Sequence, residues 1–131
     1  MIIDTSAIVA ILRAEKEARE FAEAIANVRT RRVSAVSFVE AAAVIDGSRD
    51  AVASRRFDEL FREARLVAEP VTTSQARLAR EAYRDFGKGS GHPAGLNLGD
   101  CFAYALAKEM GEPILFKGDD FRQTDLMVAK S

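Results

Sequence analysis

Met1-Ile2-Ile3-Asp4-Thr5-Ser6 is the stretch that determines the fold class, because it joins a strand directly to a helix. Residues 1–3 form a short apolar run that is typical of a buried strand. The next three residues are all types that are favoured at helix N-caps, and the apolar run at 7–12 predicts the helix that follows them. The chain therefore starts an alternating pattern of strand and helix.

The same alternation continues along the chain. Further strands are expected at 33–36, 66–71 and 113–116, with a fifth at 126–129. Amphipathic or apolar helices are expected at 15–28, 38–45, 50–65, 72–86 and 97–110. This order predicts an α/β fold, in which a parallel sheet forms the middle of three layers and helices cover both faces. In such folds the ligand site lies at the carboxyl ends of the strands.

The composition predicts one domain in a reducing compartment. A chain of 131 residues with 48% hydrophobic content can build one compact core but not two, so we predict a single domain over residues 1–131. The net charge of -1 requires any nucleic-acid contact to come from local patches. A single cysteine, Cys101, excludes an internal disulfide and zinc clusters of paired cysteines. Without a leader-like or long apolar segment, we expect a cytoplasmic protein with no membrane association.

Acidic residues follow the predicted strands or lie in the first turn of the helix beyond them. They are Asp4, Glu40, Asp100, Asp119 and Asp120. Adjacent parallel strands would bring these carboxylates to one edge of the sheet. A cluster of carboxylate oxygens suits Mg²⁺ or Mn²⁺, and a divalent cation would compensate the mutual repulsion. Such a site can activate water for in-line attack on a phosphodiester, so the pattern predicts a hydrolase that acts on phosphodiester bonds.

Each acid also has a purely structural interpretation. Ser37-Phe38-Val39-Glu40 is a capping-box pattern at the start of the helix expected at 38–45. Asn97-Leu98-Gly99-Asp100 has the analogous arrangement, and Asp4 is a good N-cap for the first helix. Asp119 and Asp120 are typical turn residues. The residues alone leave both interpretations open, although the repetition of an acid beside four different strands favours a shared site.

Four segments resemble the motifs of VapC-type toxin ribonucleases of the PIN-domain family. They are Ile2-Ile3-Asp4-Thr5-Ser6-Ala7, residues 37–40, residues 96–107 and Leu115-Phe116-Lys117-Gly118-Asp119-Asp120-Phe121. The resemblance implies that Asp4, Glu40 and Asp100 are metal-site acids, with the hydroxyl of Thr5 or Ser6 close to the metal or substrate. Many relatives carry a Thr and an Asp in the fourth motif where this chain has neither. Others place the acid directly before the Phe, which favours Asp120 and leaves Asp119 as the alternative.

The resemblance also implies an activity and partners. It implies the toxin component of a type II toxin–antitoxin system, a magnesium-dependent endoribonuclease that cleaves RNA, in many relatives a structured RNA such as tRNA. It further implies a homodimer and a VapB-like antitoxin that inserts a segment near the metal site. Basic residues that could contact phosphates are Arg29, Arg31, Arg32, Arg55, Arg56 and Lys88. The alternative is a noncatalytic binding module that uses the same fold only for dimerisation or antitoxin capture.

Overall fold

A computed structural model describes residues 1–129 of the chain and contains one parallel sheet. Its four strands are β1 (Ile2–Ile3), β2 (Arg32–Ser34), β3 (Val67–Glu69) and β4 (Ile114–Leu115). Their order across the sheet is β3-β2-β1-β4, and every pairing between them is parallel. The predicted α/β class is confirmed. The last two residues of the domain predicted over 1–131 lie outside the described part.

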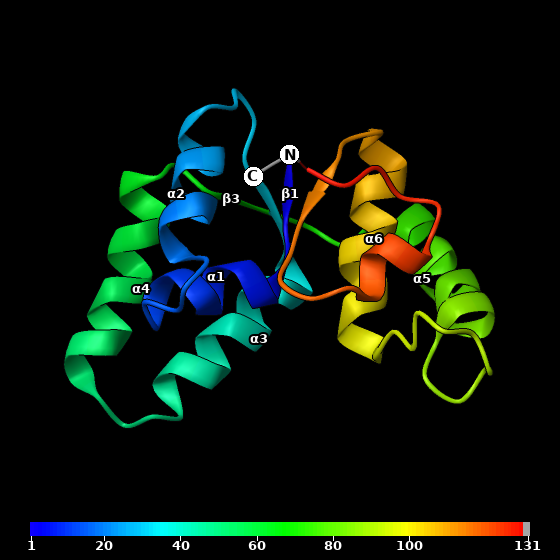
Figure 1. Cartoon of the computed structure of the whole chain (residues 1–131), viewed down its shortest axis with the longest axis horizontal. Helices are drawn as coiled ribbons and strands as arrows, with labels where there is room; N and C mark the ends of the chain where they lie inside the picture. Colours follow the sequence, from blue (N-terminus) through cyan, green and yellow to red (C-terminus); the bar gives the residue numbers. More distant parts are fainter. Residues whose placement is uncertain (130–131) are drawn as a thin grey trace.

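Helices cover both faces of the sheet, as the alternating pattern predicts. On one face lie α1 (Thr5–Leu12), α2 (Ala18–Ala26), α3 (Ala35–Asp46) and α4 (Ala51–Glu63). On the other lie α5 (Thr73–Phe86) and α6 (Leu98–Met110), with the short 3₁₀ helix η1 (Asp120–Gln123) after β4. Figure 1 shows these two helical layers on either side of the strands. Within residues 1–129, every helix is too short or too polar to cross a bilayer.

The strands divide their side chains between two hydrophobic cores. Ile2 and Ile114 contribute to the core formed with α5 and α6. Ile3 and Leu115, the next residues along the same strands, contribute to the core formed with α1–α4. This is the two-residue alternation of a strand that is buried on both faces, and all four side chains are at most 2% exposed. Two residues of β1 are therefore enough to hold both helical layers to the sheet and to fix the direction of Asp4.

Several predicted bounds differ from the structure. The strand expected at 33–36 is β2 (Arg32–Ser34), so the last two of its predicted residues belong to α3. Helix α3 begins at Ala35, three residues before the predicted start, because the Ser34 hydroxyl accepts a hydrogen bond from the Val36 amide and caps the helix there. Ser37 is consequently inside the helix and buried, so its prediction as the N-cap is wrong. The fifth strand expected at 126–129 is also wrong, since Val128 forms only an isolated parallel bridge to Ile114.

Candidate active site

The predicted acids come from four elements that meet at the carboxyl edge of the sheet. Asp4 directly follows β1 and caps α1. Glu40 lies in the second turn of α3, Asp100 in the first turn of α6, and Asp120 at the start of η1. In Figure 1 the beginnings of α1, α3 and α6 face one another below the carboxyl end of β1. The parallel topology thus brings side chains from distant parts of the sequence to one edge.

Four of these carboxylates interact with one another. The pKa of Asp100 is raised from its ordinary 3.8 to about 7. Burial is the largest cause, followed by the charges of Asp4, Asp120 and Glu40. A hydrogen bond from the Asn97 backbone acts in the opposite direction and lowers the pKa. The pKa of Glu40 is raised by burial and by the charge of Asp4. The pKa of Asp4, which is 4% exposed, is raised by burial and, to a smaller extent, by Asp120. A group of interacting like charges therefore forms at this edge.

Asp119 is the alternative candidate for the fourth acid. Its side chain is 87% exposed, and its closest described cation is the guanidinium of Arg122 at 3.9 Å. Asp119 precedes η1, whereas Asp120 is the first residue of η1 and contributes to the raised pKa values of Asp4 and Asp100. Of the two candidates for a fourth acid, the geometry favours Asp120.

The capping interpretations hold for two of the acids and fail for the third. Asp4 accepts from the Ser6 amide at 3.0 Å, and Asp100 forms a reciprocal capping box with Asn97. Asp4 and Asp100 therefore each cap a helix and also belong to the acid group. Glu40 is not in the first turn of α3, because that helix starts at Ala35, so the predicted capping box with Ser37 is wrong. No backbone cap explains the position of the Glu40 carboxylate.

The two predicted hydroxyls hold carboxylates in place. The Ser6 hydroxyl donates to Asp4 Oδ2 at 2.7 Å and accepts from the Lys117 amide at 2.9 Å. It thereby connects Asp4 to the loop after β4. Thr5 Oγ1 donates towards Glu40 Oε1 at 3.2 Å and the Ser37 carbonyl at 3.3 Å. Both hydroxyls therefore contact acids of the proposed site, and their closeness to a metal or substrate stays a prediction.

Gly99 lies against the acid group, and the sequence motifs did not single it out. A Cβ atom built on Gly99 would overlap the carboxylate of Glu40. The missing side chain therefore lets Glu40 lie against the first turn of α6, beside Asp100. Glycine is less favourable than alanine in a helix. A glycine next to Asp100 in the first turn of a predicted helix therefore indicates a close contact at this position, and the sequence shows that much.

The acid group fits a hard divalent cation. All four side chains offer oxygen ligands only, which suits Mg²⁺ or Mn²⁺. Burial and neighbouring carboxylates raise the pKa values of Asp4, Glu40 and Asp100, and a bound cation would compensate the negative charge gathered there. Among residues 1–129, no three His, Cys, Asp or Glu side chains are already grouped closely enough to enclose an ion.

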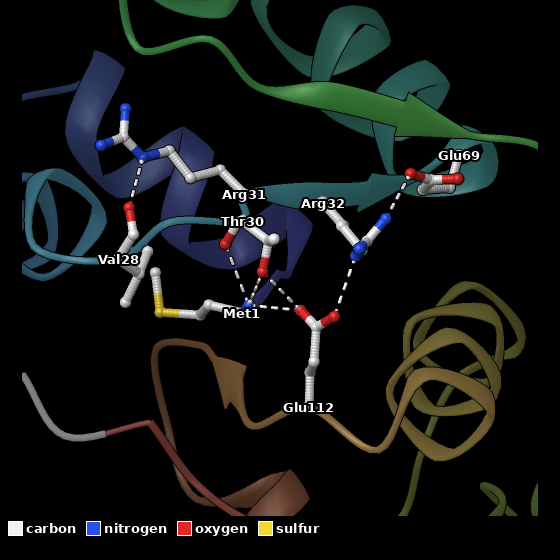
Figure 2. Close-up of polar contacts among 7 residues, drawn as sticks. All are labelled: Met1, Val28, Thr30, Arg31, Arg32, Glu69 and Glu112. Carbon is white, nitrogen blue, oxygen red and sulfur yellow. Dashed lines mark hydrogen bonds and ion pairs between the residues drawn. The ribbon is translucent and has the colours of Figure 1, made fainter.

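Most of the predicted phosphate-contacting arginines have other roles. Arg31 donates to the backbone carbonyls of Val28, Ala26 and Ala64. Arg32, the first residue of β2, forms ion pairs with Glu69 and Glu112, both at 2.9 Å (Figure 2). Arg55 pairs with Glu59 on the surface of α4 at 3.8 Å. These contacts lie away from the acid group, and the sequence could not distinguish them from phosphate ligands.

Comparison with known proteins gives matches over nearly the whole chain. The PIN-domain family model matches residues 1–126. The chain is 59% identical over 129 residues to Ribonuclease VapC28 of Mycobacterium tuberculosis, covering 98% of this chain and 97% of that protein. It is 47% identical over 126 residues to Ribonuclease VapC of Mycolicibacterium smegmatis, covering 96% and 97% respectively.

Two solved structures share the fold. The crystal structure of Mycobacterium tuberculosis VapC20, described as a Sarcin-Ricin loop cleaving toxin, superposes with a TM-score of 0.77 at 15% identity. That match covers 99% of this chain and 98% of the other. A toxin–antitoxin complex from Klebsiella pneumoniae gives a TM-score of 0.68 at 16% identity, covering 92% and 88%.

Proposed function

The chain belongs to the PIN-domain family, and from that premise we propose that it is a metal-dependent endoribonuclease of the VapC type, the toxin of a type II toxin–antitoxin pair. The observation that carries the proposal is the mutual interaction of Asp4, Glu40, Asp100 and Asp120 at one edge of a parallel sheet. Relatives named as ribonucleases match this chain over almost its full length. A noncatalytic binding module would gain nothing from gathering half-buried like charges, which destabilise the protein unless a cation compensates them.

Magnesium, with manganese as a substitute, is the proposed cofactor. Asp4 and Asp100 are the proposed direct ligands, because they are held by caps at the ends of adjacent elements. Glu40 and Asp120 complete the acid group and would act directly or through bound water. When bound, the ion would activate a water molecule and stabilise the leaving oxygen of the phosphodiester.

The protein's own residues would keep the acids aligned for that chemistry. The Ser6 hydroxyl fixes the orientation of the Asp4 carboxylate through its 2.7 Å hydrogen bond, and Thr5 Oγ1 does the same for Glu40. The Asn97 amide donates to Asp100 Oδ2 at 3.0 Å and leaves Oδ1 available. Side chains restrained in this way lose little conformational freedom when a ligand binds.

The proposed partners are an RNA substrate, such as a structured RNA of the tRNA class, a VapB-like antitoxin and a second copy of the chain, in the cytoplasm. The Klebsiella pneumoniae structure of the same fold is a toxin–antitoxin complex, which supports the antitoxin.

Val39 and Leu98 support the dimer, because these large apolar side chains are 62% and 61% exposed and directly precede Glu40 and Gly99. Val39→Asp should then convert a dimer to a monomer in sedimentation measurements, whereas an unchanged mass would contradict this interface.

The function is tested by Asp4→Asn with Asp119→Asn as its matched control. Asparagine is also a good N-cap, so Asp4→Asn should preserve α1 while removing a metal-site charge. We expect loss of Mg²⁺-dependent RNA cleavage in Asp4→Asn and near wild-type cleavage in Asp119→Asn. Cleavage that persists in Asp4→Asn, or that does not respond to EDTA in the wild type, would contradict the proposal.

A further inference from the structure

We propose that Lys117 is a substrate-binding residue of the acid site: its ammonium group leaves Glu15 and Glu17 and binds a phosphate next to the cleaved bond. This inference rests on the proposed ribonuclease function and deepens it. It assigns an RNA contact to a side chain that the fourth motif does not mark as functional.

The backbone of Lys117 is attached to the acid group. Its amide donates to the Ser6 hydroxyl at 2.9 Å, and that hydroxyl donates to Asp4 Oδ2 at 2.7 Å. Phe116 on one side is buried, and Gly118 on the other adopts a φ of 101°, a value that L side chains rarely reach. The position of the Lys117 backbone relative to Asp4 is therefore fixed by its surroundings.

The side chain of Lys117, in contrast, is held by two ion pairs near the surface. Its Nζ lies 2.9 Å from Glu15 Oε1 and 3.6 Å from Glu17 Oε2, in the segment between α1 and α2. The Lys117 side chain is 39% exposed and those of Glu15 and Glu17 are 31% and 19% exposed, so water reaches the ammonium group and weakens these pairs. A flexible four-carbon chain can exchange these carboxylates for a phosphate at small cost.

The charge balance of the site favours such an exchange. Asp4, Glu40, Asp100 and Asp120 repel a polyanion, and a divalent ion compensates only part of their charge. The other cation of this segment, Arg122, lies over the Phe116 ring at 5.7 Å and 3.9 Å from Asp119. Lys117 differs from Arg122 because its amide belongs to the hydrogen-bond chain that ends on Asp4.

The test compares Lys117→Met with Lys108→Met. Lys108 is a close match, since it is 40% exposed and pairs with Asp125 at 2.8 Å, away from the acid group. With a short single-stranded RNA in EDTA, where no cleavage occurs, Lys117→Met should weaken binding about 5- to 20-fold and reduce the slope of log Kd against log salt by about one phosphate contact. Lys117→Arg should retain most of the affinity, and Lys108→Met should match the wild type.

Glu15→Gln separates a binding role from a structural one. If Lys117 only fastens the α1–α2 segment, Glu15→Gln and Lys117→Met break the same ion pair and should act in the same direction. If the ammonium is a phosphate ligand, Glu15→Gln removes its competitor and should tighten RNA binding about 2- to 5-fold. Equal binding by Lys117→Met and Lys108→Met would overturn the role of Lys117 while leaving the ribonuclease intact. Wild-type protein that neither binds nor cleaves RNA would overturn both proposals.

Discussion

Charged groups lie at both ends of the sheet, but they differ in their partners. Glu112 at the amino end forms two ion pairs, whereas within residues 1–129 the carboxylates of Asp4, Glu40, Asp100 and Asp120 at the carboxyl end form none. At the amino end the Met1 ammonium and Arg32 both donate to Glu112, and Arg32 also reaches across to Glu69, the last residue of β3 (Figure 2). Burial opposes ionisation of Glu112, but hydrogen bonds from these two cations outweigh it, so the pKa of Glu112 is lowered. At the carboxyl end, burial and like charges raise the pKa values of Asp4, Glu40 and Asp100.

The opposite directions of these pKa shifts distinguish two kinds of charged group: those that stabilise the fold and those that would serve the proposed function. Compensated groups at the amino end join β1, β2 and the segment before β4 and lower the free energy of the folded state. The uncompensated acids at the carboxyl end cost stability in the absence of a cation. A charge cluster that weakens the free protein is expected where a ligand supplies the missing charge.

Asp100→Asn should have the largest effect and should move activity and stability in opposite directions. Loss of a proposed metal ligand should reduce Mg²⁺-dependent RNA cleavage by about 100-fold or more. In EDTA the same change should raise the free energy of unfolding by about 1–2 kcal/mol, because it removes a half-buried like charge while Asn can still accept hydrogen bonds. Cleavage assays and urea denaturation in EDTA measure the two effects, and a variant that is both inactive and destabilised would contradict this account.

Gly99→Ala should disturb the acid group without removing any charge. Its Cβ would displace the Glu40 carboxylate, so cleavage should fall about 10- to 100-fold even though alanine favours a helix more than glycine does. A double-mutant cycle with Glu40→Ala is the control: once the carboxylate is absent, Gly99→Ala should cause little further loss. Additive losses would show that Gly99 does not act through Glu40.

Ser6→Ala should produce a smaller loss, because it removes the positioning of Asp4 and not the ligand itself. We expect cleavage to fall about 10-fold, mainly in kcat, as the Asp4 carboxylate loses its 2.7 Å hydrogen bond. A higher concentration of Mn²⁺ should restore part of the activity. An unchanged kcat would contradict the positioning role.

Glu112→Gln tests the amino end, where stability should change and activity should not. Without the Glu112 charge, the Met1 ammonium and Arg32 lose a shared partner, and the free energy of unfolding should fall by about 1–2 kcal/mol. RNA cleavage below the melting temperature should remain within about 2-fold of the wild type, since Glu112 lies at the opposite end of the sheet. A cleavage loss comparable to that of Asp100→Asn would remove the distinction between the two ends.

The pH dependence of stability should differ in sign between the ends. The pKa of Asp100 is raised from 3.8 to about 7, so its favourable contribution is complete below the unfolded value and is lost as pH rises through about 7. Glu112 has a lowered pKa, so its contribution is present above its unfolded value and is lost only in more acidic solution. In EDTA, stability should therefore fall between about pH 4 and pH 7 in the wild type, and Asp100→Asn should flatten that fall. Denaturation curves across this range provide the check.

The fold and most of the acids could be predicted because they depend on local patterns. Alternation of strand and helix fixes a parallel sheet, and parallel strands bring Asp4, Asp100 and Asp120 to one edge. The Asn97–Asp100 capping box was likewise visible in the sequence and is present in the structure.

What the sequence could not provide depends on contacts between distant segments. Ser34 and Ser37 are both residue types that are favoured at N-caps. Ser34 caps α3 because β2 ends at that residue, and the position of this end depends on the pairing of β2 in the sheet. The choice between Asp119 and Asp120 depends on the direction in which η1 turns. Sequence patterns also could not reveal that Arg32 pairs with Glu69 and Glu112, residues 37 and 80 positions away.

Anomalous diffraction from crystals soaked in Mn²⁺ would locate a bound metal ion. We expect a manganese peak at the carboxyl edge of the sheet, with Asp4 and Asp100 as ligands, and loss of that peak in Asp100→Asn. A manganese ion bound elsewhere, with the four acids left without an ion at saturating Mn²⁺, would contradict the account.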